Sequence, residues 1–261
     1  MSSGYIVWHD LYAFDPAAAQ PFYRDLFGWT ISTENMGGNP YTMAKLGDVP
    51  IGGFGPLSGE IGSHPYWNVY FSTPDLDRAI ERILANGGTI VHPGFDIPGI
   101  GRMAFALDNT GASFSPFQQA DPTTPANWPP INPAPGEIVW HDHMSEDPAA
   151  AARFYATVFD IDATDWSSPD FTCLGLQREG QTIGVILAKP QPDVPTCWNT
   201  YVESPGPVAD VKERVVELGG TVLHGPAHHP GFGDFLIIED PAGGVLGTVV
   251  SEMWRADGTS D

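Results

Sequence analysis

The sequence predicts an α+β protein made of two tandem domains, each built from two strand–helix–three-strand (βαβββ) units. The main observation is a stretch that occurs twice. Ile-Val-Trp-His-Asp at 6–10 leads through Asp-Pro-Ala-Ala-Ala at 15–19 to Phe-Tyr at 22–23, and the same residues recur 132 positions later. A proline-rich segment separates the two copies, and strand and helix patterns follow each copy in the same order. A strand-to-helix opening repeated at half the chain length indicates an internal duplication.

The first unit sets the pattern for the other three. Residues 5–13 are expected to form a strand and residues 16–27 a helix, with Asp15 as N-cap and Pro16 at the first helical position. Gly28 suits the left-handed residue that follows a helix. Three further strands are predicted between Asn-, Gly- and Pro-rich turns, at 29–34, 41–46 and 50–54.

The other units repeat this order. In the second, a strand at 66–73 precedes a helix that Pro74-Asp75 opens and Gly87-Gly88 ends, and strands follow at 89–92, 102–107 and 112–117. The helices of the third and fourth units are expected near 148–158 and 207–218.

The domain boundaries follow from the repeat and from the prolines. We expect domains at 1–119 and 136–251 and a tail at 252–261. The linker at 120–135 contains six prolines, which predict an extended and rather stiff segment.

The composition restricts the partners. With 11 Lys and Arg against 32 Asp and Glu, the net charge of −21 repels nucleic acid and anionic membranes. No apolar run approaches the roughly 20 residues that span a bilayer, and no signal-peptide pattern is visible, so a cytoplasmic protein is expected. We expect a small-molecule ligand, and a monomer or homodimer.

Four such units in two pairs resemble the vicinal oxygen chelate superfamily, which includes glyoxalase I, extradiol dioxygenases and bleomycin-type antibiotic-resistance proteins. The resemblance rests on Leu-Phe-Gly-Trp at 26–29, on the stretch 95–103, and on the turns Asp-Asn-Thr-Gly-Ala at 108–112 and Asp-Pro-Ala-Gly-Gly at 240–244. It covers nearly the whole chain outside the linker and is greatest for two-domain glyoxalase-like proteins. It implies two glyoxalase-like domains whose curved mixed sheets each enclose a cavity.

The resemblance also implies metal ligands on the first and last strands of each unit pair. The matching positions hold Trp8, Trp140, Asn68, Asn199, Ser115 and Gly247, with the remaining position near Gly53 or Val185. None of these residues is His or Glu, and together they offer a transition metal very little. We therefore expect no cofactor, and neither glyoxalase I nor dioxygenase activity.

His9 and His141 are the alternative metal ligands. Side chains alternate along a strand, so each should point away from the cavity unless a bulge turns it inward.

Asp10 and Asp142 share the orientation of Trp8 and Trp140, which directs them into the cavities. A carboxylate in an apolar cavity must be paired, hydrogen-bonded or raised in pKa. It serves either as a general base or polar anchor for a ligand, or as a structural acceptor. Arg102 is the expected partner of Asp10, and because its counterpart is Asp234, the first cavity is expected to be the active one.

Tyr70 is predicted to complete the catalytic set of Asp10, Arg102 and Asp142. Ligand contacts are expected from the inward or neighbouring side chains of the first and last strands: Trp8, Trp67, Asn68, Trp140, Asn199 and Tyr201.

Three functions remain open on these residues. The first is an enzyme that carries out acid–base chemistry of the lyase, isomerase or hydrolase type on a small organic molecule. The second is a non-catalytic binding protein for an aromatic molecule or antibiotic. The third is a metal-dependent glyoxalase or dioxygenase with shifted ligands.

Overall fold

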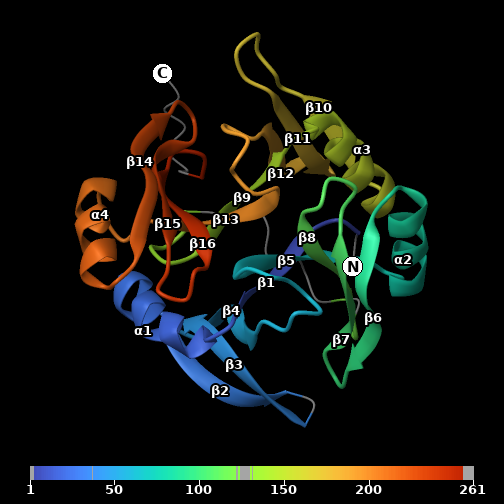
Figure 1. Cartoon of the computed structure of the whole chain (residues 1–261), viewed down its shortest axis with the longest axis horizontal. Helices are drawn as coiled ribbons and strands as arrows, with labels where there is room; N and C mark the ends of the chain where they lie inside the picture. Colours follow the sequence, from blue (N-terminus) through green and yellow to red (C-terminus); the bar gives the residue numbers. More distant parts are fainter. Residues whose placement is uncertain (1–2, 37, 122, 124–129, 131, 255–261) are drawn as a thin grey trace.

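Each half of the chain forms one strongly curved sheet of eight strands and contributes two helices (Figure 1). The computed structural model describes residues 3–36, 38–121, 123, 130 and 132–254. The two tandem domains of the predicted α+β fold are confirmed. Their boundaries at 119, 136 and 251 remain a prediction, and most of the linker and the end of the tail lie outside the described residues.

The elements have these bounds. The first half contains β1 (Ile6–Ala13), α1 (Pro16–Phe27), β2 (Thr30–Met36), β3 (Asn39–Leu46), β4 (Val49–Pro56), β5 (Tyr66–Ser72), α2 (Leu76–Ala85), β6 (Thr89–Ile97), β7 (Gly101–Leu107) and β8 (Ser113–Gln119). The second half contains β9 (Ile138–Ser145), α3 (Pro148–Phe159), β10 (Asp162–Asp165), β11 (Cys173–Arg178), β12 (Gln181–Ala188), β13 (Cys197–Glu203), α4 (Val208–Glu217), β14 (Thr221–His229), β15 (Gly233–Glu239) and β16 (Val245–Ser251). No helix in the described part of the chain is long and apolar enough to cross a bilayer.

The strand order is the same in both sheets. In the first it is β2-β3-β4-β1-β5-β8-β7-β6, and in the second β10-β11-β12-β9-β13-β16-β15-β14. The antiparallel pairs β1–β5 and β9–β13 join the two units of each half at the centre of the sheet. The first strand of every unit therefore lies at the floor of the curve.

The opening helices follow their sequence signals closely. Pro16 and Pro148 occupy the first turns of α1 and α3. Gly28 ends α1 in a left-handed conformation, with φ of 73°, as its glycine predicts. The same conformation at the end of α3 is held by Asp160, with φ of 61°.

The hairpin of β6 and β7 is longer than predicted, and its counterpart matches it. β6 continues from the predicted 89–92 to Ile97, and β14 continues in the same way to His229. The register shifts within both strands, between His92 and Phe95 in β6 and between His224 and Ala227 in β14. These irregularities take up the intervening Pro and Gly residues, so the pairing resumes beyond them.

The convex faces of the two sheets pack on each other through cores that mix the halves. One core combines β5, β8 and α2 of the first half with α3 and the strands beside it. The other combines β1 and α1 with α4 and the strands β15 and β16. As Figure 1 shows, α1 and α4 lie together on one flank and α2 and α3 on the other. Each core is thus made by the first unit of one half and the second unit of the other.

Two reciprocal hydrogen bonds join the halves within these cores. The Tyr23 hydroxyl donates to Oδ2 of Asp240 at 2.6 Å, and the Tyr155 hydroxyl donates to Oδ2 of Asp108 at 3.0 Å. An indole N–H donates to each tyrosine hydroxyl in turn, from Trp67 at 2.9 Å and from its counterpart Trp198 at 2.8 Å. The Phe-Tyr motif of one half therefore binds the turn aspartate of the other.

The Tyr155–Asp108 and Tyr23–Asp240 contacts differ in that only Asp108 has a histidine beside it. Burial raises the pKa of both turn carboxyls, but His143 lies 2.7 Å from Asp108 and, with backbone and hydroxyl donors, it holds the pKa of Asp108 below its usual value. Residue 11, at the position of His143 in the first half, is leucine, and there burial keeps the pKa of Asp240 raised.

His9 and His141 meet at the centre of the interface between the sheets. Their rings are nearly coplanar, with an interplanar angle of 3°, and the two Nε2 atoms are 2.7 Å apart. Burial lowers the pKa of His9 to about 3 and that of His141 well below its ordinary value, so both are neutral. One Nε2–H therefore donates to the other Nε2.

Removing a tyrosine hydroxyl from this interface is expected to destabilise the whole protein. Tyr23→Phe leaves Asp240 and Trp67 short of a buried partner, and Tyr155→Phe has the same effect on Asp108. We expect the free energy of unfolding in urea to fall by about 1–3 kcal/mol for each. The control is Tyr66→Phe, whose hydroxyl donates to the Ile61 carbonyl within one half, and which should cost less. Equal losses in all three variants would contradict the assigned role.

Candidate functional site

The concave side of the first sheet holds Asp10 at its floor. Asp10 is 4% exposed and lies on β1, opposite Gly53 of β4 and Asn68 of β5. A β-carbon on Gly53 would collide with Oδ1 of Asp10 and with the Tyr41 hydroxyl. The glycine at that position therefore makes room for the contact between these two side chains.

Four donors surround the Asp10 carboxylate. Oδ1 accepts from the Tyr41 hydroxyl at 2.5 Å and from the Trp8 indole at 3.1 Å. Oδ2 accepts from Tyr70 at 2.5 Å and, more weakly, from Tyr12 at 3.4 Å. Burial raises the pKa of Asp10 despite these donors. The Trp8 indole and the Tyr12 hydroxyl share their hydrogens with the Tyr41 and Tyr70 oxygens, each at 2.8 Å. Two short hydrogen bonds and two shared ones thus surround a carboxylate that has about four lone-pair directions.

Two predicted site residues lie elsewhere. Arg102 does not pair with Asp10. Its side chain faces the helix side of β7, where it bonds Asp77 of α2 at 3.2 Å and Asp96 of β6 at 3.0 Å. Its neighbour Met103 packs with Tyr70 on the concave side instead. The prediction was wrong because strand alternation places residues 102 and 103 on opposite faces.

Trp67 is likewise absent from the concave face. It is 3% exposed and packs in a convex core, where it donates to Tyr23. Asn68, the next residue, does face inward, and its Nδ2 donates to the Ser115 hydroxyl at 2.9 Å.

Asp142 is the counterpart of Asp10 on the concave side of the second sheet, but it has fewer donors. It is 6% exposed and accepts from the Trp140 indole at 2.8 Å and from the Tyr201 hydroxyl. Cys173 takes the place of Tyr41 and Met144 the place of Tyr12. Burial raises the pKa of Asp142 to about 6, and this carboxylate has acceptor capacity left over.

Asn199 lies beside Asp142 and has lost the partner that its counterpart keeps. Gly247 stands where the first half has Ser115, and a β-carbon there would lie 2.1 Å from the Tyr201 ring. Tyr201 therefore fills the space of the missing serine. Asn199 is 5% exposed, and neither its Nδ2 nor its Oδ1 makes a close hydrogen bond to another described residue. The amide interacts only weakly with the Tyr201 hydroxyl, whose pKa it lowers against the effect of burial, and it can therefore still bind a ligand.

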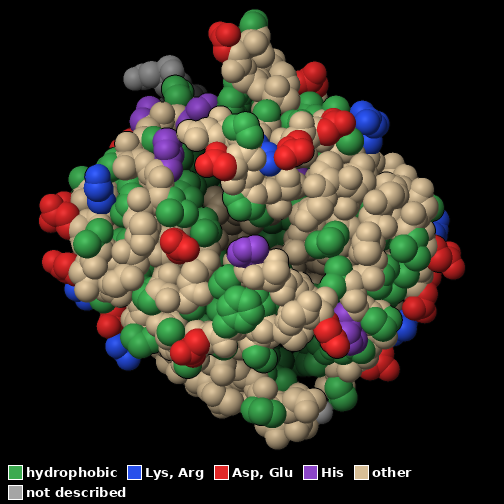
Figure 2. Space-filling view, viewed as in Figure 1, with side chains coloured by type: hydrophobic (Ala, Val, Ile, Leu, Met, Phe, Trp, Pro, Cys, Tyr) green, Lys and Arg blue, Asp and Glu red, His purple; other side chains and the backbone are tan. Residues whose placement is uncertain are grey.

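Aromatic side chains line the second concavity. The centroid of the Trp140 ring lies 6.1 Å from that of Trp254 and 6.4 Å from that of Phe232. Trp166, directly after β10, packs over Gly175, where a β-carbon would lie 2.4 Å from its ring. The surface in Figure 2 is hollowed between the two arms of this sheet.

Some of these residues were not predicted. Trp166 and Trp254 come from segments outside the predicted strands, and Tyr41 reaches Asp10 only through the pairing of β3, β4 and β1. For Tyr41 the available signal was its inward place on a predicted strand.

The positions that carry metal ligands in the resembling superfamily do not fit a metal here. They hold indole, amide and hydroxyl groups or no polar side chain, and the Asn68 amide is engaged by Ser115. In the described part of the chain, no three His, Cys, Asp or Glu side chains converge as a metal site. His9 and His141 face the interface between the sheets, and their nitrogen atoms approach too closely to hold an ion between them.

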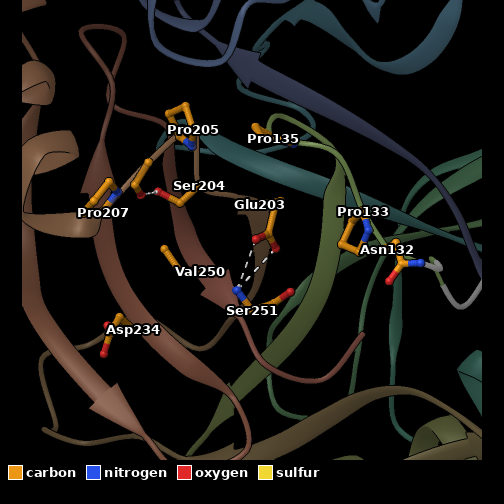
Figure 3. A pocket seen from close by; sticks show the side chains of 11 residues that line it. Asn132, Pro133, Pro135, Glu203, Ser204, Pro205, Pro207, Asp234, Val250 and Ser251 are labelled. Atoms are coloured by element: carbon orange, nitrogen blue, oxygen red, sulfur yellow. Dashed lines mark hydrogen bonds between the residues drawn. The ribbon is translucent and has the colours of Figure 1, made fainter. Parts of the chain in front are cut away.

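A separate hollow of about 640 Å³ lies beside the linker (Figure 3). It is lined by Pro133, Pro135, Pro205 and Pro207 and by the side chains of Glu203, Asp234 and Ser251. The Glu203 carboxylate accepts from the Ser251 backbone N–H. This hollow is not part of either concave site.

Comparisons with known proteins agree with this fold. Residues 5–115 match the profile of the Glyoxalase/Bleomycin resistance protein/Dioxygenase superfamily. The chain is 29% identical over 244 residues to a Mycobacterium tuberculosis protein named Putative glyoxylase CFP32, with 92% of both chains covered. It is also 29% identical over 247 residues to the anthracycline biosynthesis protein DnrV of Streptomyces peucetius, with 85% of both covered.

Solved structures share the architecture at low identity. The Mn(II)-bound glyoxalase of Novosphingobium aromaticivorans has a TM-score of 0.63 and 17% identity, over 95% of this chain and 82% of that one. The 2,3-dioxygenase LapB of Pseudomonas sp. KL28 has a TM-score of 0.63 and 13% identity, over 95% and 93%. These likenesses concern the fold alone.

The raised pKa of Asp142 predicts a specific pH dependence of stability. An acid whose folded pKa exceeds its unfolded value stabilises the fold below the unfolded pKa, and this stability is lost as the pH rises through the folded pKa of about 6. Asp142→Asn removes this dependence. Between about pH 4 and pH 7.5, the variant should therefore gain up to about 3 kcal/mol relative to the unmodified protein. Urea unfolding at both pH values measures the difference, and a constant difference would contradict the shifted pKa.

Proposed function

We propose that the chain is a glyoxalase-like enzyme acting on a small organic molecule without a metal, since residues 5–115 match the profile of the Glyoxalase/Bleomycin resistance protein/Dioxygenase superfamily. The reaction is a proton transfer at a carbon next to a carbonyl group, which leads to an isomerisation or an elimination. The site is the second concavity, with Asp142 as the general base. This proposal replaces the expectation that the first cavity is the active one, since Arg102 lies away from Asp10.

One observation carries the proposal: the contrast between the two carboxylates. Asp10 has two short tyrosine donors and two shared donors within hydrogen-bond distance, whereas Asp142 accepts from two and has a pKa of about 6. A base works best when its pKa lies near the working pH and when it can still accept a proton. Asp142 meets both conditions better than Asp10 does.

The neighbouring side chains suit the other half of such a step. When Asp142 takes the proton, the electron pair of the C–H bond moves towards the carbonyl oxygen, where negative charge develops. The Asn199 Nδ2–H, which makes no close hydrogen bond and only a weak contact with Tyr201, is a donor for that oxygen. The protonated Asp142 then returns the proton to another carbon, or a leaving group departs from the neighbouring carbon. Burial raises the pKa of Cys173 to about 11, so its thiol stays protonated and is not the nucleophile.

A binding protein is the second candidate, and Asp10 favours it for the first concavity. The Tyr41, Tyr70 and Trp8 groups are fixed by the carboxylate and present an ordered aromatic surface without a free base. Such a surface selects a ligand but leaves no group to move its proton. The names of the relatives, one a glyoxylase and one an anthracycline biosynthesis protein, are compatible with either candidate.

Hydrogen exchange tests the enzymatic proposal without a known substrate. A panel of hydroxyketones and aryl methyl ketones is incubated with the protein in D2O, and loss of the proton next to the carbonyl is followed by NMR. We expect exchange with at least one panel member, rising with pH through about 6. Asp142→Asn should lower the rate by about 100-fold or more, because the base is removed.

The matched control is Asp10→Asn, which changes the corresponding carboxylate of the first half. It should lower the exchange rate by less than about tenfold. A larger loss in Asp10→Asn than in Asp142→Asn would transfer the site to the first concavity. Exchange that is equal in both variants and the unmodified protein, or absent for the whole panel, would contradict the proposal.

The independence from metal has its own test. After dialysis against a strong chelator, the exchange rate and the thermal midpoint should stay unchanged, because no group at the superfamily's ligand positions fits a metal. Elemental analysis of the untreated protein should give well below one transition metal ion per chain. A stoichiometric metal whose removal abolishes exchange would restore the metal-dependent alternative.

A further inference from the structure

The second concavity differs from the first in the shape of ligand that it accommodates. Trp140 and Trp254 stand near each other at its floor, and Trp166 lies over Gly175 on the opposite arm of the sheet. The corresponding position to Trp166 in the first half is Glu34, which pairs with Lys45. The tryptophan is thus particular to the second half.

The rim of this concavity is bridged by a second aromatic contact. Phe171, in the loop after Trp166, packs on His229 at the end of β14, with ring centroids 5.7 Å apart. β10 and β14 are the two outer strands of the sheet, so this contact joins its opposite edges. Trp166 and Phe171 are nonetheless 42% and 43% exposed, far more than aromatic side chains that have found their final packing.

Asn199 supplies the polar half of the recognition. Both of its amide atoms are buried without a close hydrogen bond, and the weak contact with the Tyr201 hydroxyl satisfies at most one of them, which is costly unless a ligand completes the set. An amide side chain with a free donor and a free acceptor forms two parallel hydrogen bonds with a group that offers the complementary pair. Amides, lactams and vicinal hydroxy-carbonyl groups have this pattern.

We infer that the second concavity binds a planar, uncharged aromatic molecule whose edge carries an adjacent hydrogen-bond donor and acceptor. Indole faces enclose the plane of the ligand, and Asn199 pairs with its polar edge beside Asp142. An anionic ligand is disfavoured there, because burial and two hydrogen bonds account for the pKa of Asp142 and no basic side chain among the described residues contributes to it. The inference rests on the proposed function for the location of the site, and it adds the class of ligand.

Three matched probes separate shape from hydrogen bonding. 2-Naphthamide is planar and offers both a donor and an acceptor. Decahydronaphthalene-2-carboxamide keeps the amide but is not planar, and 2-acetylnaphthalene keeps the plane but offers only an acceptor. By calorimetry, we expect one 2-naphthamide per chain, with each of the other probes binding about tenfold or more weakly.

Variants place the binding in the second half. Trp166→Ala and Asn199→Leu should each weaken 2-naphthamide binding by about tenfold or more. Asn199→Ser keeps a polar group and serves if the leucine variant unfolds. Glu34→Ala, at the position equivalent to Trp166, should leave the affinity unchanged. Equal affinity for the planar and saturated amides, or unchanged affinity in Trp166→Ala and Asn199→Ser, would overturn the inference.

Ligand binding and hydrogen exchange, both measured on the unmodified protein, distinguish this inference from the proposed function. Binding that follows the probes' shape while exchange is absent in the unmodified protein would reject the enzymatic proposal and keep the ligand class. Exchange without preference for the planar amide would do the reverse.

Discussion

The arrangement of this protein depends on the tyrosine–aspartate hydrogen bonds that connect its halves. Tyr23 and Tyr155 are buried in convex cores, and each needs an acceptor that its own half does not provide there. The acceptor comes from the closing turn of the opposite half, which brings a whole unit with it. The helix layers are consequently shared, and neither half would keep a satisfied core by itself. The concave faces are left free of this structural role.

Strand alternation then divides the central strands between two tasks. On β1, His9 belongs to the interface while Trp8 and Asp10 belong to the concavity, and β9 repeats the division. The interface side is nearly the same in both halves. The concave side has diverged, since Cys173 and Gly247 replace a tyrosine and a serine. Apart from His143 in place of Leu11, these differences between the halves lie on the face that packing constrains least.

Much of the fold could be predicted from the sequence, because caps, turns and the repeat act locally. The inward orientation of Asp10 and Asp142 also followed from alternation. Arg102 was misplaced because its partners Asp77 and Asp96 come from a helix and a neighbouring strand whose positions only the sheet order fixes. The position of Trp166 could not be predicted, because a loop turns its ring over Gly175 and no local pattern indicates such a contact. The short contact of Tyr41 with Asp10 was equally hidden, since Tyr41 arrives across two strand pairings.

The contact between His9 and His141 sets a limit on how alike the two halves can be. A hydrogen bond between two neutral imidazoles needs one donor and one acceptor, so the residues on either side of the pseudo-twofold axis cannot share a tautomer. Even two identical copies meeting at this point would have to differ by the location of a single hydrogen atom. The symmetry of the duplicated chain thus ends at its centre, and each half carries a distinguishable protonation pattern before any ligand is bound.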